Sequence, residues 1–295
     1  MHIQGGGRPP LYTLVPSESL IEKCCLIANP AAGNPTQYLV EQAFERGGLD
    51  WRFMTFEVDT ERLGDAMRGA RALGFHGVKI GEPFQVEVVG FVDEQTDVAR
   101  KSGSINCITA VGERLVGDNT EATAFLSLVK QHLDPVGRPA TVLGSGRMAR
   151  VAAMTLAGAG ASPITIASRN AATGQQLVET IQQQSSSTAS YLPLGAGIVE
   201  SETALLVNTT SIGSTNPDAK MPLDLESFGP KLVVAEVAFN TARTWLTAQA
   251  AQKGCRIIDG LSLYVEQTAL ALKAWTGAAP DTVAMREAAE EFLGI

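Results

Sequence analysis

Residues Thr141–Ala149 read TVLGSGRMA, in which a short apolar run leads through two glycines into an Ala-rich segment with helical spacing. The pattern Gly-x-Gly-x-x-Ala between a strand and a helix is typical of a dinucleotide-binding turn. Gly144 permits the tight turn, Gly146 lets the backbone approach a pyrophosphate, and Ala149 lets the helix pack close to the strand. The helix N-terminus then offers free N–H groups to the phosphates. The stretch predicts a Rossmann-type coenzyme site, with a ligand-free tight turn as the alternative; the expected coenzyme contacts here are Gly144, Ser145, Gly146, Arg147, Met148 and Ala149.

The end of the next expected strand bears on the choice between NAD and NADP. That strand ends in Ser168-Arg169-Asn170, whereas NAD-selective sites usually place an acidic side chain here for the ribose hydroxyls. Arg169 can instead pair with a 2′-phosphate through charge-assisted hydrogen bonds. The sequence therefore favours NADP, with NAD as the alternative and a solvated surface arginine as the plainest explanation of Arg169. Ser168 and Asn170 are expected to line the same site.

Short apolar runs alternate with amphipathic segments along nearly the whole chain, which indicates α/β construction with parallel strands. The expected strands are 24–28, 51–58, 77–81, 140–144, 163–168, 204–210, 231–237 and 255–259, and a hairpin is expected to join 105–111 to 114–117. The expected helices cover 36–47, 60–73, 84–93, 120–133, 147–160, 170–184, 261–276 and 280–293. Asp281 is the expected N-cap of the last helix. The polar stretch 182–190 is expected to be a loop.

Composition limits the classes of protein and partner. The chain has 295 residues, of which 45% are hydrophobic and 18% charged, as in globular proteins of one large or two medium domains. A net charge of −8 argues against a nucleic-acid or anionic-membrane partner. No apolar run is long enough for a membrane span, and the N-terminus does not resemble a secretory signal, so we expect a cytoplasmic protein. The four cysteines are expected to be reduced and buried, and the three histidines do not suggest a metal site.

Further motifs carry a family resemblance. Gly117–Glu121 (GDNTE), Ser104–Cys107 (SINC) and Asn208–Gly213 (NTTSIG) are similar to Gly-Asp-Asn-Thr-Asp, Ala-Val-Asn-Thr and Asn-Ala-Thr-Ser-x-Gly of the shikimate dehydrogenase family. The chain resembles that family from about Cys25 to the C-terminal helix. The resemblance implies an N-terminal α/β substrate domain, a Rossmann-type doubly wound dinucleotide-binding domain, and C-terminal helices that return to the first domain. It places an N-terminal tail at 1–20, the substrate domain at 21–121 completed by 261–295, and the Rossmann domain at 122–260.

The same resemblance implies a reaction and further coenzyme contacts. The family transfers a hydride reversibly between NADPH and a ring ketone, 3-dehydroshikimate, in the cleft between the two domains. The expected partner is therefore a small carboxylated ring substrate, bound by a monomer or a homodimer. The additional coenzyme contacts implied are Thr209, Thr210, Ser211, Val237 and Gly260.

The chain departs from the family at the residues that handle the proton. The position of the family's lysine is Gln85, that of a nearby threonine is Gly81, and that of its aspartate is Glu121. Lys79 precedes Gly81 by two residues, so on a strand the two share a face. We hypothesise that Lys79 supplies the missing cation with Glu121 as its carboxylate partner. The alternative is a lysine that reaches solvent or pairs with Glu82.

The substrate-binding positions are partly retained. Asn34 and Thr36 stand at the family's carboxylate-binding serine pair, while Asn106 and Gln267 match their family positions and are expected to hold ring hydroxyls. Phe239 stands at a family tyrosine. These changes leave two alternatives to a shikimate-type dehydrogenase. One is a catalytically weak or inactive dinucleotide- or metabolite-binding protein, and the other is a quinate-type dehydrogenase that uses NAD.

Overall fold

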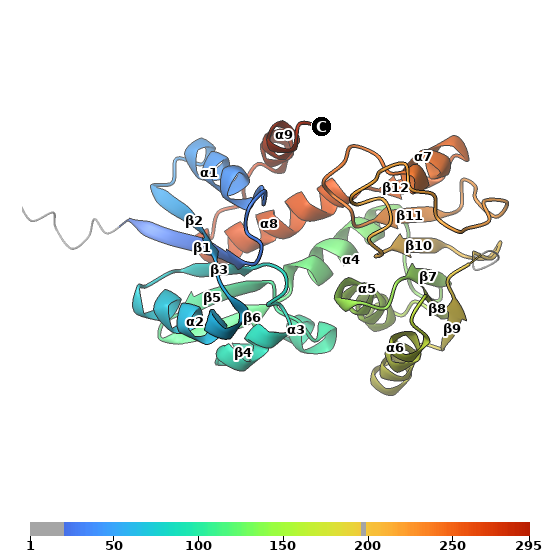
Figure 1. Cartoon of the computed structure of the whole chain (residues 1–295), viewed down its shortest axis with the longest axis horizontal. Helices are drawn as coiled ribbons and strands as arrows, with labels where there is room; N and C mark the ends of the chain where they lie inside the picture. The colour runs from blue at the N-terminus through green and yellow to red at the C-terminus, as the bar shows by residue number, and fades with distance from the viewer. Residues whose placement is uncertain (1–20, 196–198) are drawn as a thin grey trace, which may run out of the picture.

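The computed structural model describes residues 21–195 and 199–295, which form two six-stranded sheets with helices around them (Figure 1). The expected tail at 1–20 lies outside the described residues. The strands are β1 (Glu22–Ala28), β2 (Trp51–Glu57), β3 (Gly77–Ile80), β4 (Glu94–Gln95), β5 (Cys107–Val111), β6 (Arg114–Asp118), β7 (Ala140–Leu143), β8 (Ile164–Ser168), β9 (Ala189–Pro193), β10 (Leu205–Asn208), β11 (Val233–Glu236) and β12 (Arg256–Ile258). The helices are α1 (Thr36–Arg46), α2 (Leu63–Ala72), α3 (Asp97–Ser102), α4 (Thr120–His132), α5 (Arg147–Gly158), α6 (Ala171–Gln184), α7 (Trp245–Gln252), α8 (Gly260–Thr276) and α9 (Thr282–Leu293), with 3-10 turns η2 (Thr60–Arg62) and η3 (Glu87–Phe91).

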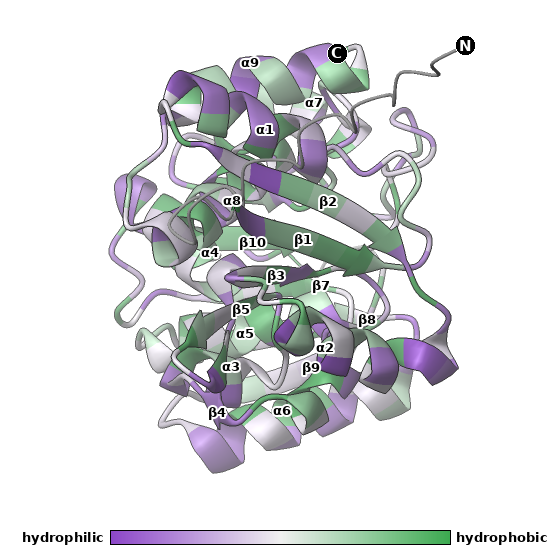
Figure 2. Cartoon of the chain, turned by 90° about the vertical axis from the view of Figure 1, so that its left-hand side faces the viewer, coloured by the Kyte–Doolittle hydropathy of each residue, from purple (hydrophilic) through white to green (hydrophobic). Residues whose placement is uncertain are grey.

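The first sheet has the strand order β2-β1-β3-β5-β6-β4 and is buried on both faces. Cys24, Leu26 and Ala28 of β1 share a core with α1, α8 and α9, whereas Cys25 and Ile27 share a second core with α2. Figure 2 shows the hydrophobic strand β1 between these helix layers. A central strand that alternates between two apolar layers must be apolar throughout, which explains the continuous CCLIA run. The expected hairpin is present as the antiparallel pair β5 and β6.

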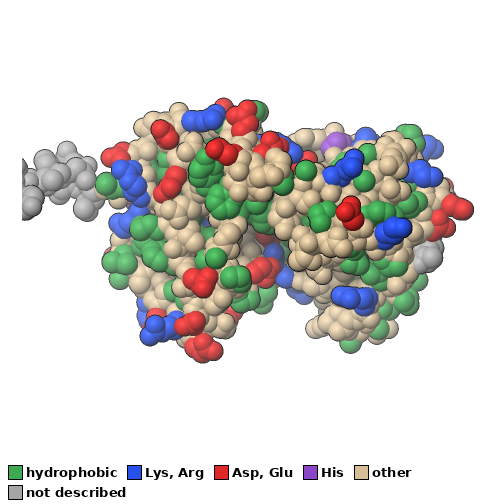
Figure 3. All heavy atoms as spheres, turned by 45° about the horizontal axis from the view of Figure 1, so that its top comes forward, with side chains coloured by type: hydrophobic (Ala, Val, Ile, Leu, Met, Phe, Trp, Pro, Cys, Tyr) green, Lys and Arg blue, Asp and Glu red, His purple; other side chains and the backbone are tan. Residues whose placement is uncertain are grey.

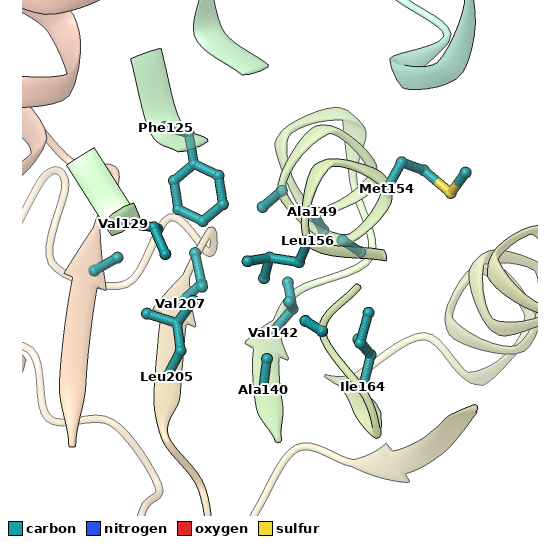
Figure 4. Packing of buried hydrophobic residues seen from close by; sticks show 14 of the residues in the cluster. Phe125, Val129, Ala140, Val142, Ala149, Met154, Leu156, Ile164, Leu205 and Val207 are labelled. Carbon is teal, nitrogen blue, oxygen red and sulfur yellow. The ribbon is translucent and has the colours of Figure 1, made fainter. Parts of the chain in front are cut away.

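The second sheet is parallel throughout, in the order β12-β11-β10-β7-β8-β9. Counted from β7 as the first strand, this is the 3-2-1-4-5-6 order of the Rossmann fold, read from the β9 edge. Figure 4 shows Val142 and Val207 of the central strands facing Phe125 of α4 and Leu156 of α5, which lie together on one face of the sheet; all four are fully buried. Leu246 of α7 belongs to a separate core on the other face. The predicted fold class is confirmed.

The C-terminal helices connect the second sheet to the first. Helix α8 begins directly after β12, where the Asp259 side chain accepts a hydrogen bond from Ser262 N, and crosses towards the first sheet (Figure 1). At its far end the indole of Trp275 donates to Ile108 O of β5 at 3.0 Å. Helix α9 then packs on α1, with the rings of Tyr38 and Phe292 5.9 Å apart. The expected return of these helices to the first domain is therefore observed.

Some elements differ from those expected. The stretch predicted as a loop at 182–190 includes the start of β9, which pairs in parallel with β8. Strand β9 is an edge strand with half-buried or exposed residues, and only its first two residues, Ala189 and Ser190, fall within the stretch predicted as a loop. The helix expected at 84–93 is only the 3-10 turn η3, in a segment whose valines and Gly90 have low helix propensity. Helices α3 and α7 were not expected. Asp281 is the N-cap of α9 as predicted, accepting from Val283 N and Ala284 N.

The four cysteines are free and buried, in agreement with the sequence-based expectation. Burial raises the pKa of the Cys25 and Cys107 thiols to about 12, so both stay protonated near neutral pH. Across residues 21–195 and 199–295, none of the helices combines the length and apolar character that crossing a membrane requires.

Candidate active site

The glycine-rich turn lies at the point of the second sheet where the strand order reverses. It follows β7, whose neighbours are β8 on one side and β10 on the other. Gly144 has φ +112°, and a Cβ there would lie 2.5 Å from the Thr209 hydroxyl at the end of β10. Gly146 has no atom within 4 Å of the place where its Cβ would be, so it faces open space. The carboxyl edge at such a switch point is where open α/β sheets bind ligands.

A groove of about 870 Å³ opens at this edge. Of the predicted coenzyme contacts, those lining it are Gly144, Ser145, Gly146, Ser168, Arg169, Asn170, Thr209, Thr210 and Ser211. Gly146 is the N-cap of α5 and provides no side-chain cap, so the first N–H groups of that helix are left for a ligand. Arg169 is the only cationic side chain among the described residues that line the groove.

A buried carboxylate that the sequence analysis did not single out supports the β10 loop. Glu236 of β11 is 2% exposed and accepts hydrogen bonds from Asn208 Nδ2, Ala238 N and the Thr244 hydroxyl. Burial raises its pKa, and the bond from Asn208 counters part of that rise. Asn208 Oδ1 in turn accepts from Thr210 N at 3.0 Å, which orders the start of the Thr209–Ser211 segment. An acidic residue inside the apolar run KLVVAEV is the sequence signal for this network.

The two sheets form two lobes, visible in Figure 3 with a constriction between them, and a second pocket of about 280 Å³ draws its lining from both. Lys79, Gln85 and Glu121 come from the first lobe, and Arg147 and Met148 come from α5 of the second. The remaining predicted contacts divide between this pocket and the core. Val237 and Gly260 line the pocket rather than the coenzyme groove, and Ala149, in the first turn of α5, is buried at 1% exposure.

Arg147 joins the two lobes through ion pairs. Its Nε lies 2.9 Å from Glu82 Oε1, and its Nη1 lies 2.5 Å from Glu121 Oε2. Burial opposes the charge of Arg147, but Glu121 and Glu82 outweigh it and raise the arginine pKa. The guanidinium therefore stays charged and holds both carboxylates. Its side chain points into the second pocket, whereas the sequence placed it among the coenzyme contacts.

Lys79 is 5% exposed and lines the same pocket. Its Nζ donates to Gln267 Oε1 at 3.2 Å, and no Lys79–Glu121 ion pair is formed within the described part of the chain. Burial lowers the pKa of Lys79, and the charge of Glu121 restores part of it. The pocket thus holds an ammonium group that gives up its proton more easily than an exposed lysine does.

A chain of hydrogen bonds fixes Gln267. Thr120 N donates to Asn106 Oδ1 at 2.7 Å, and Asn106 Nδ2 donates to Gln267 Oε1 at 2.8 Å. Gln267 lines the pocket, but Asn106 does not, and it is 1% exposed. Asn106 therefore lies behind Gln267 and orients it, while Gln267 is the one of the pair that faces the pocket.

The positions of the family's serine pair are tied to a tyrosine of α8. The Thr36 and Tyr264 hydroxyls lie 2.5 Å apart, and they lie 2.6 and 2.9 Å from Asn34 Oδ1. Thr36 is fully buried, so only Asn34 of the predicted pair lines the pocket. Phe239 stacks on the Tyr264 ring with centroids 4.2 Å apart. The role of Tyr264 is not visible in the sequence, because its partners lie 228 or more residues away.

No cluster of three or more potential metal ligands occurs in the segments 21–195 and 199–295. The first cavity has a glycine-rich turn at an uncapped helix N-terminus and the cation of Arg169. The second has a buried amine, two carboxylates and amides held by hydrogen bonds. Such a set can bind a dinucleotide and position a polar substrate beside a proton donor.

Comparison with known proteins gives consistent matches. Residues 26–108 match the family described as shikimate dehydrogenase substrate binding domain, and residues 127–217 match shikimate / quinate 5-dehydrogenase. A shikimate dehydrogenase (NADP(+)) of Geobacter metallireducens is 34% identical over 88% of this chain and 93% of its own length.

Two solved structures are similar to this chain over nearly its whole length. The ligand-free 5-ketofructose reductase of Gluconobacter sp. strain CHM43 is 31% identical with a TM-score of 0.89, over 92% of this chain and 99% of that one. The shikimate 5-dehydrogenase of Thermus thermophilus, solved with NADP(H) and shikimate, is 28% identical with a TM-score of 0.79, over 92% of this chain and 100% of that one.

Proposed function

Because the chain belongs to the shikimate dehydrogenase family, we propose that it is an NADP-dependent oxidoreductase that transfers a hydride reversibly between NADPH and 3-dehydroshikimate or a related polyhydroxylated ketone. One observation carries this proposal. Arg147 and Met148 follow the glycine-rich turn directly, and they line the same pocket as Lys79 and Glu121. A coenzyme bound along the turn would reach the substrate pocket from that side.

The residues of the groove fit a phosphorylated dinucleotide. The absence of any neighbour near the Cβ position of Gly146 leaves room for a pyrophosphate against the backbone, and the uncapped N–H groups of α5 favour negative charge. Arg169 offers charge-assisted bonds to a 2′-phosphate, which favours NADP over NAD. When bound, NADPH supplies the hydride that reduces the carbonyl carbon.

We assign proton transfer to Lys79. Reduction of a ketone consumes one NADPH and one proton and yields NADP⁺ and an alcohol, so the carbonyl oxygen needs a proton as the carbon receives the hydride. Lys79 is a buried donor whose lowered pKa makes it a better acid than a free lysine. In the reverse direction the neutral amine would accept the proton of the alcohol.

Glu121 and Arg147 have supporting roles in this scheme. Glu121 keeps a negative charge near Lys79, and its ion pair with Arg147 fixes the carboxylate in place. Asn106 orients Gln267, which holds the Lys79 ammonium and faces the substrate. We therefore place substrate contact at Gln267 and Asn34, with Asn106 and Thr36 acting from behind them.

A second candidate is reduction of a ketose, as in the 5-ketofructose reductase. Two observations favour it. The TM-score of that enzyme with this chain is 0.89, against 0.79 for the shikimate complex. In addition, Gln85 replaces the lysine implied by the family pattern, so the substrate half of the site differs from the one that handles a shikimate-type ring.

The remaining assignments follow the two sheets. Residues 21–121 with 261–295 would form the substrate domain and residues 122–260 the coenzyme domain. Free, buried cysteines are compatible with the reducing cytoplasm, where we propose that the protein acts. We propose a monomer or a homodimer, and light scattering of the purified chain distinguishes the two.

The test is a coupled measurement of turnover and coenzyme choice. NADPH and NADH oxidation are followed by the absorbance of the reduced nicotinamide with 3-dehydroshikimate and 5-ketofructose, and NADP⁺ reduction is followed with shikimate and quinate. The proposal requires turnover of at least one substrate, with NADPH preferred to NADH. Tight NADPH binding without turnover on any of them would instead support the inactive binding protein.

A further inference from the structure

The amide side chains of the substrate pocket have fixed orientations. Asn34 Oδ1 accepts from Thr36 N at 3.0 Å, so the NH₂ group of Asn34 is the end left for a ligand. Gln267 Oε1 accepts from both Lys79 and Asn106, which leaves its NH₂ group free in the same way. A backbone N–H and a lysine ammonium can only donate, so the contacts of Thr36 N and Lys79 Nζ fix both amide orientations. Asn34 and Gln267 therefore present hydrogen-bond donors to the pocket.

In Gln85, by contrast, the acceptor end of the amide is left unpaired. Its Nε2 donates to Ile80 O at 3.1 Å, which turns Oε1 away from the strand. Gln85 Oε1 is buried and has no hydrogen-bond partner, and the residue lines the pocket at 5% exposure. An unpaired buried carbonyl oxygen costs about 1–3 kcal/mol in general, so such groups are usually satisfied by a ligand or an ordered water. Only a donor can satisfy it, and a substrate hydroxyl is one.

The charges of the pocket do not favour an anion. Two cations and two carboxylates line it, and the guanidinium of Arg147 is already bonded to both Glu82 and Glu121. The hydroxyls of Thr36 and Tyr264 are engaged with Asn34 Oδ1 and with each other. A substrate carboxylate would add a third negative charge next to the two glutamates. It also cannot donate a hydrogen bond to Gln85, because an ionised carboxylate only accepts.

We propose that the pocket selects an uncharged polyhydroxy ketone over a carboxylated one, and that Gln85 is a specificity-determining residue that accepts a hydrogen bond from a substrate hydroxyl. A hydroxyl both donates and accepts hydrogen bonds. One substrate hydroxyl can therefore donate a hydrogen bond to Gln85 Oε1 while neighbouring hydroxyls accept hydrogen bonds from Asn34 and Gln267. This inference rests on the proposed function, and it chooses between the two candidate substrates named there.

The first test compares substrates on the full-length protein. The kcat/KM for NADPH oxidation is measured with 5-ketofructose, which has no charge, and with 3-dehydroshikimate, which carries a carboxylate. We expect kcat/KM to be higher for the uncharged ketone by about tenfold or more, the effect of one unfavourable charge contact. An equal or higher value for 3-dehydroshikimate would overturn the inference and leave the oxidoreductase function standing. Turnover of neither would overturn the proposed function itself.

The second test isolates Gln85. Gln85→Leu is expected to raise KM for the uncharged ketone by about tenfold, with the NADPH dissociation constant unchanged. Gln175→Leu on α6 makes the same substitution at an exposed position and should leave KM unchanged. Because Gln85 also binds Ile80 O, the variant alone does not separate recognition from structure.

Deoxy analogues of the ketone separate the two roles. In the wild-type protein, kcat/KM should be about tenfold lower for the analogue that lacks the hydroxyl bound by Gln85 than for the parent ketone. In the Gln85→Leu variant, kcat/KM should be the same for that analogue and the parent ketone. If Gln85→Leu instead loses the same factor on every analogue, Gln85 acts only on the fold, and its assignment is overturned.

Discussion

Replacing Lys79 by methionine should abolish most of the activity while preserving the fold. Methionine keeps the length and the apolar stem of lysine, and it removes a charge that is buried at 5% exposure. Burial of that charge is itself unfavourable, so the substitution should not lower the stability appreciably. What is lost is the ammonium that donates to Gln267 Oε1 at 3.2 Å and faces the pocket.

The size of the effect follows from the role of the group. A positioned general acid contributes roughly 10²- to 10⁴-fold, which corresponds to about 2.7–5.4 kcal/mol of activation free energy. Arg147 does not replace it, because its pKa is raised by Glu121 and Glu82 against the effect of burial and it keeps its protons. We therefore expect kcat to fall by about 10²-fold or more in Lys79→Met.

The lowered pKa of Lys79 also predicts how the rate of each reaction direction changes with pH. Burial lowers the pKa of Lys79 below its ordinary value of 10.5, and Glu121 only partly restores it. Ketone reduction needs the protonated amine. Its rate should therefore be at its maximum below the pKa of Lys79 in the folded protein and should fall as the pH rises through that pKa. Alcohol oxidation needs the neutral amine and should show the opposite trend. Both limbs should disappear in Lys79→Met.

The assay is initial-rate NADPH oxidation and NADP⁺ reduction across alkaline pH, with the exposed Lys101→Met on α3 as the matched control. Lys101→Met should keep wild-type rates and both limbs. Lys79→Met activity within about threefold of wild type, or an unchanged pH limb, would refute the assignment of the proton to Lys79.

Three further predictions concern the coenzyme and the fold. Gly146→Val should weaken NADPH binding by about tenfold or more in a fluorescence titration without lowering the melting temperature, because its Cβ would meet no protein atom within 4 Å and the side chain would extend into the groove. Wild-type affinity would contradict a pyrophosphate at this turn. Arg169→Ala should cost NADPH about 1.5–3 kcal/mol of binding free energy and leave NADH binding unchanged, and equal losses for both coenzymes would exclude a 2′-phosphate contact. Gly77→Ala should lower the free energy of unfolding in urea by about 1–3 kcal/mol, since its Cβ would overlap the Trp275 ring. Unchanged stability would contradict tight packing of α8 against β3 at this position.

The coenzyme groove could be predicted from the sequence because most of the residues that form its turn are contiguous in the chain. The turn, its glycines and the start of α5 lie within a few residues, and the side chains after β8 and β10 reach the same groove because parallel strands end at one edge. Local chemistry therefore predicts the fold and the places of Gly144 and Arg169, whereas Thr209 is a contact that only the family resemblance implies.

The substrate half depends on contacts between distant parts of the chain. Arg147 lies next to the coenzyme turn in sequence, but it reaches Glu82, 65 residues away, and thus lines the other pocket. Tyr264 joins Thr36 across 228 residues, which buries a threonine that the sequence placed against substrate. Gln85 shows the same limit, since the loss of a lysine is visible in sequence but the unpaired acceptor it leaves is visible only in the fold.

Direct hydride transfer in the cleft is the central claim, and isotope transfer tests it most directly. The protein is incubated with NADPH deuterated at C4 on the transferred face and with a polyhydroxy ketone that it turns over, and the alcohol is examined by mass spectrometry and NMR. We predict one deuterium on the new carbinol carbon of each product molecule and none on oxygen after exchange with water. An alcohol without deuterium, or the same result from both C4 epimers, would contradict a coenzyme and substrate held face to face in this pocket.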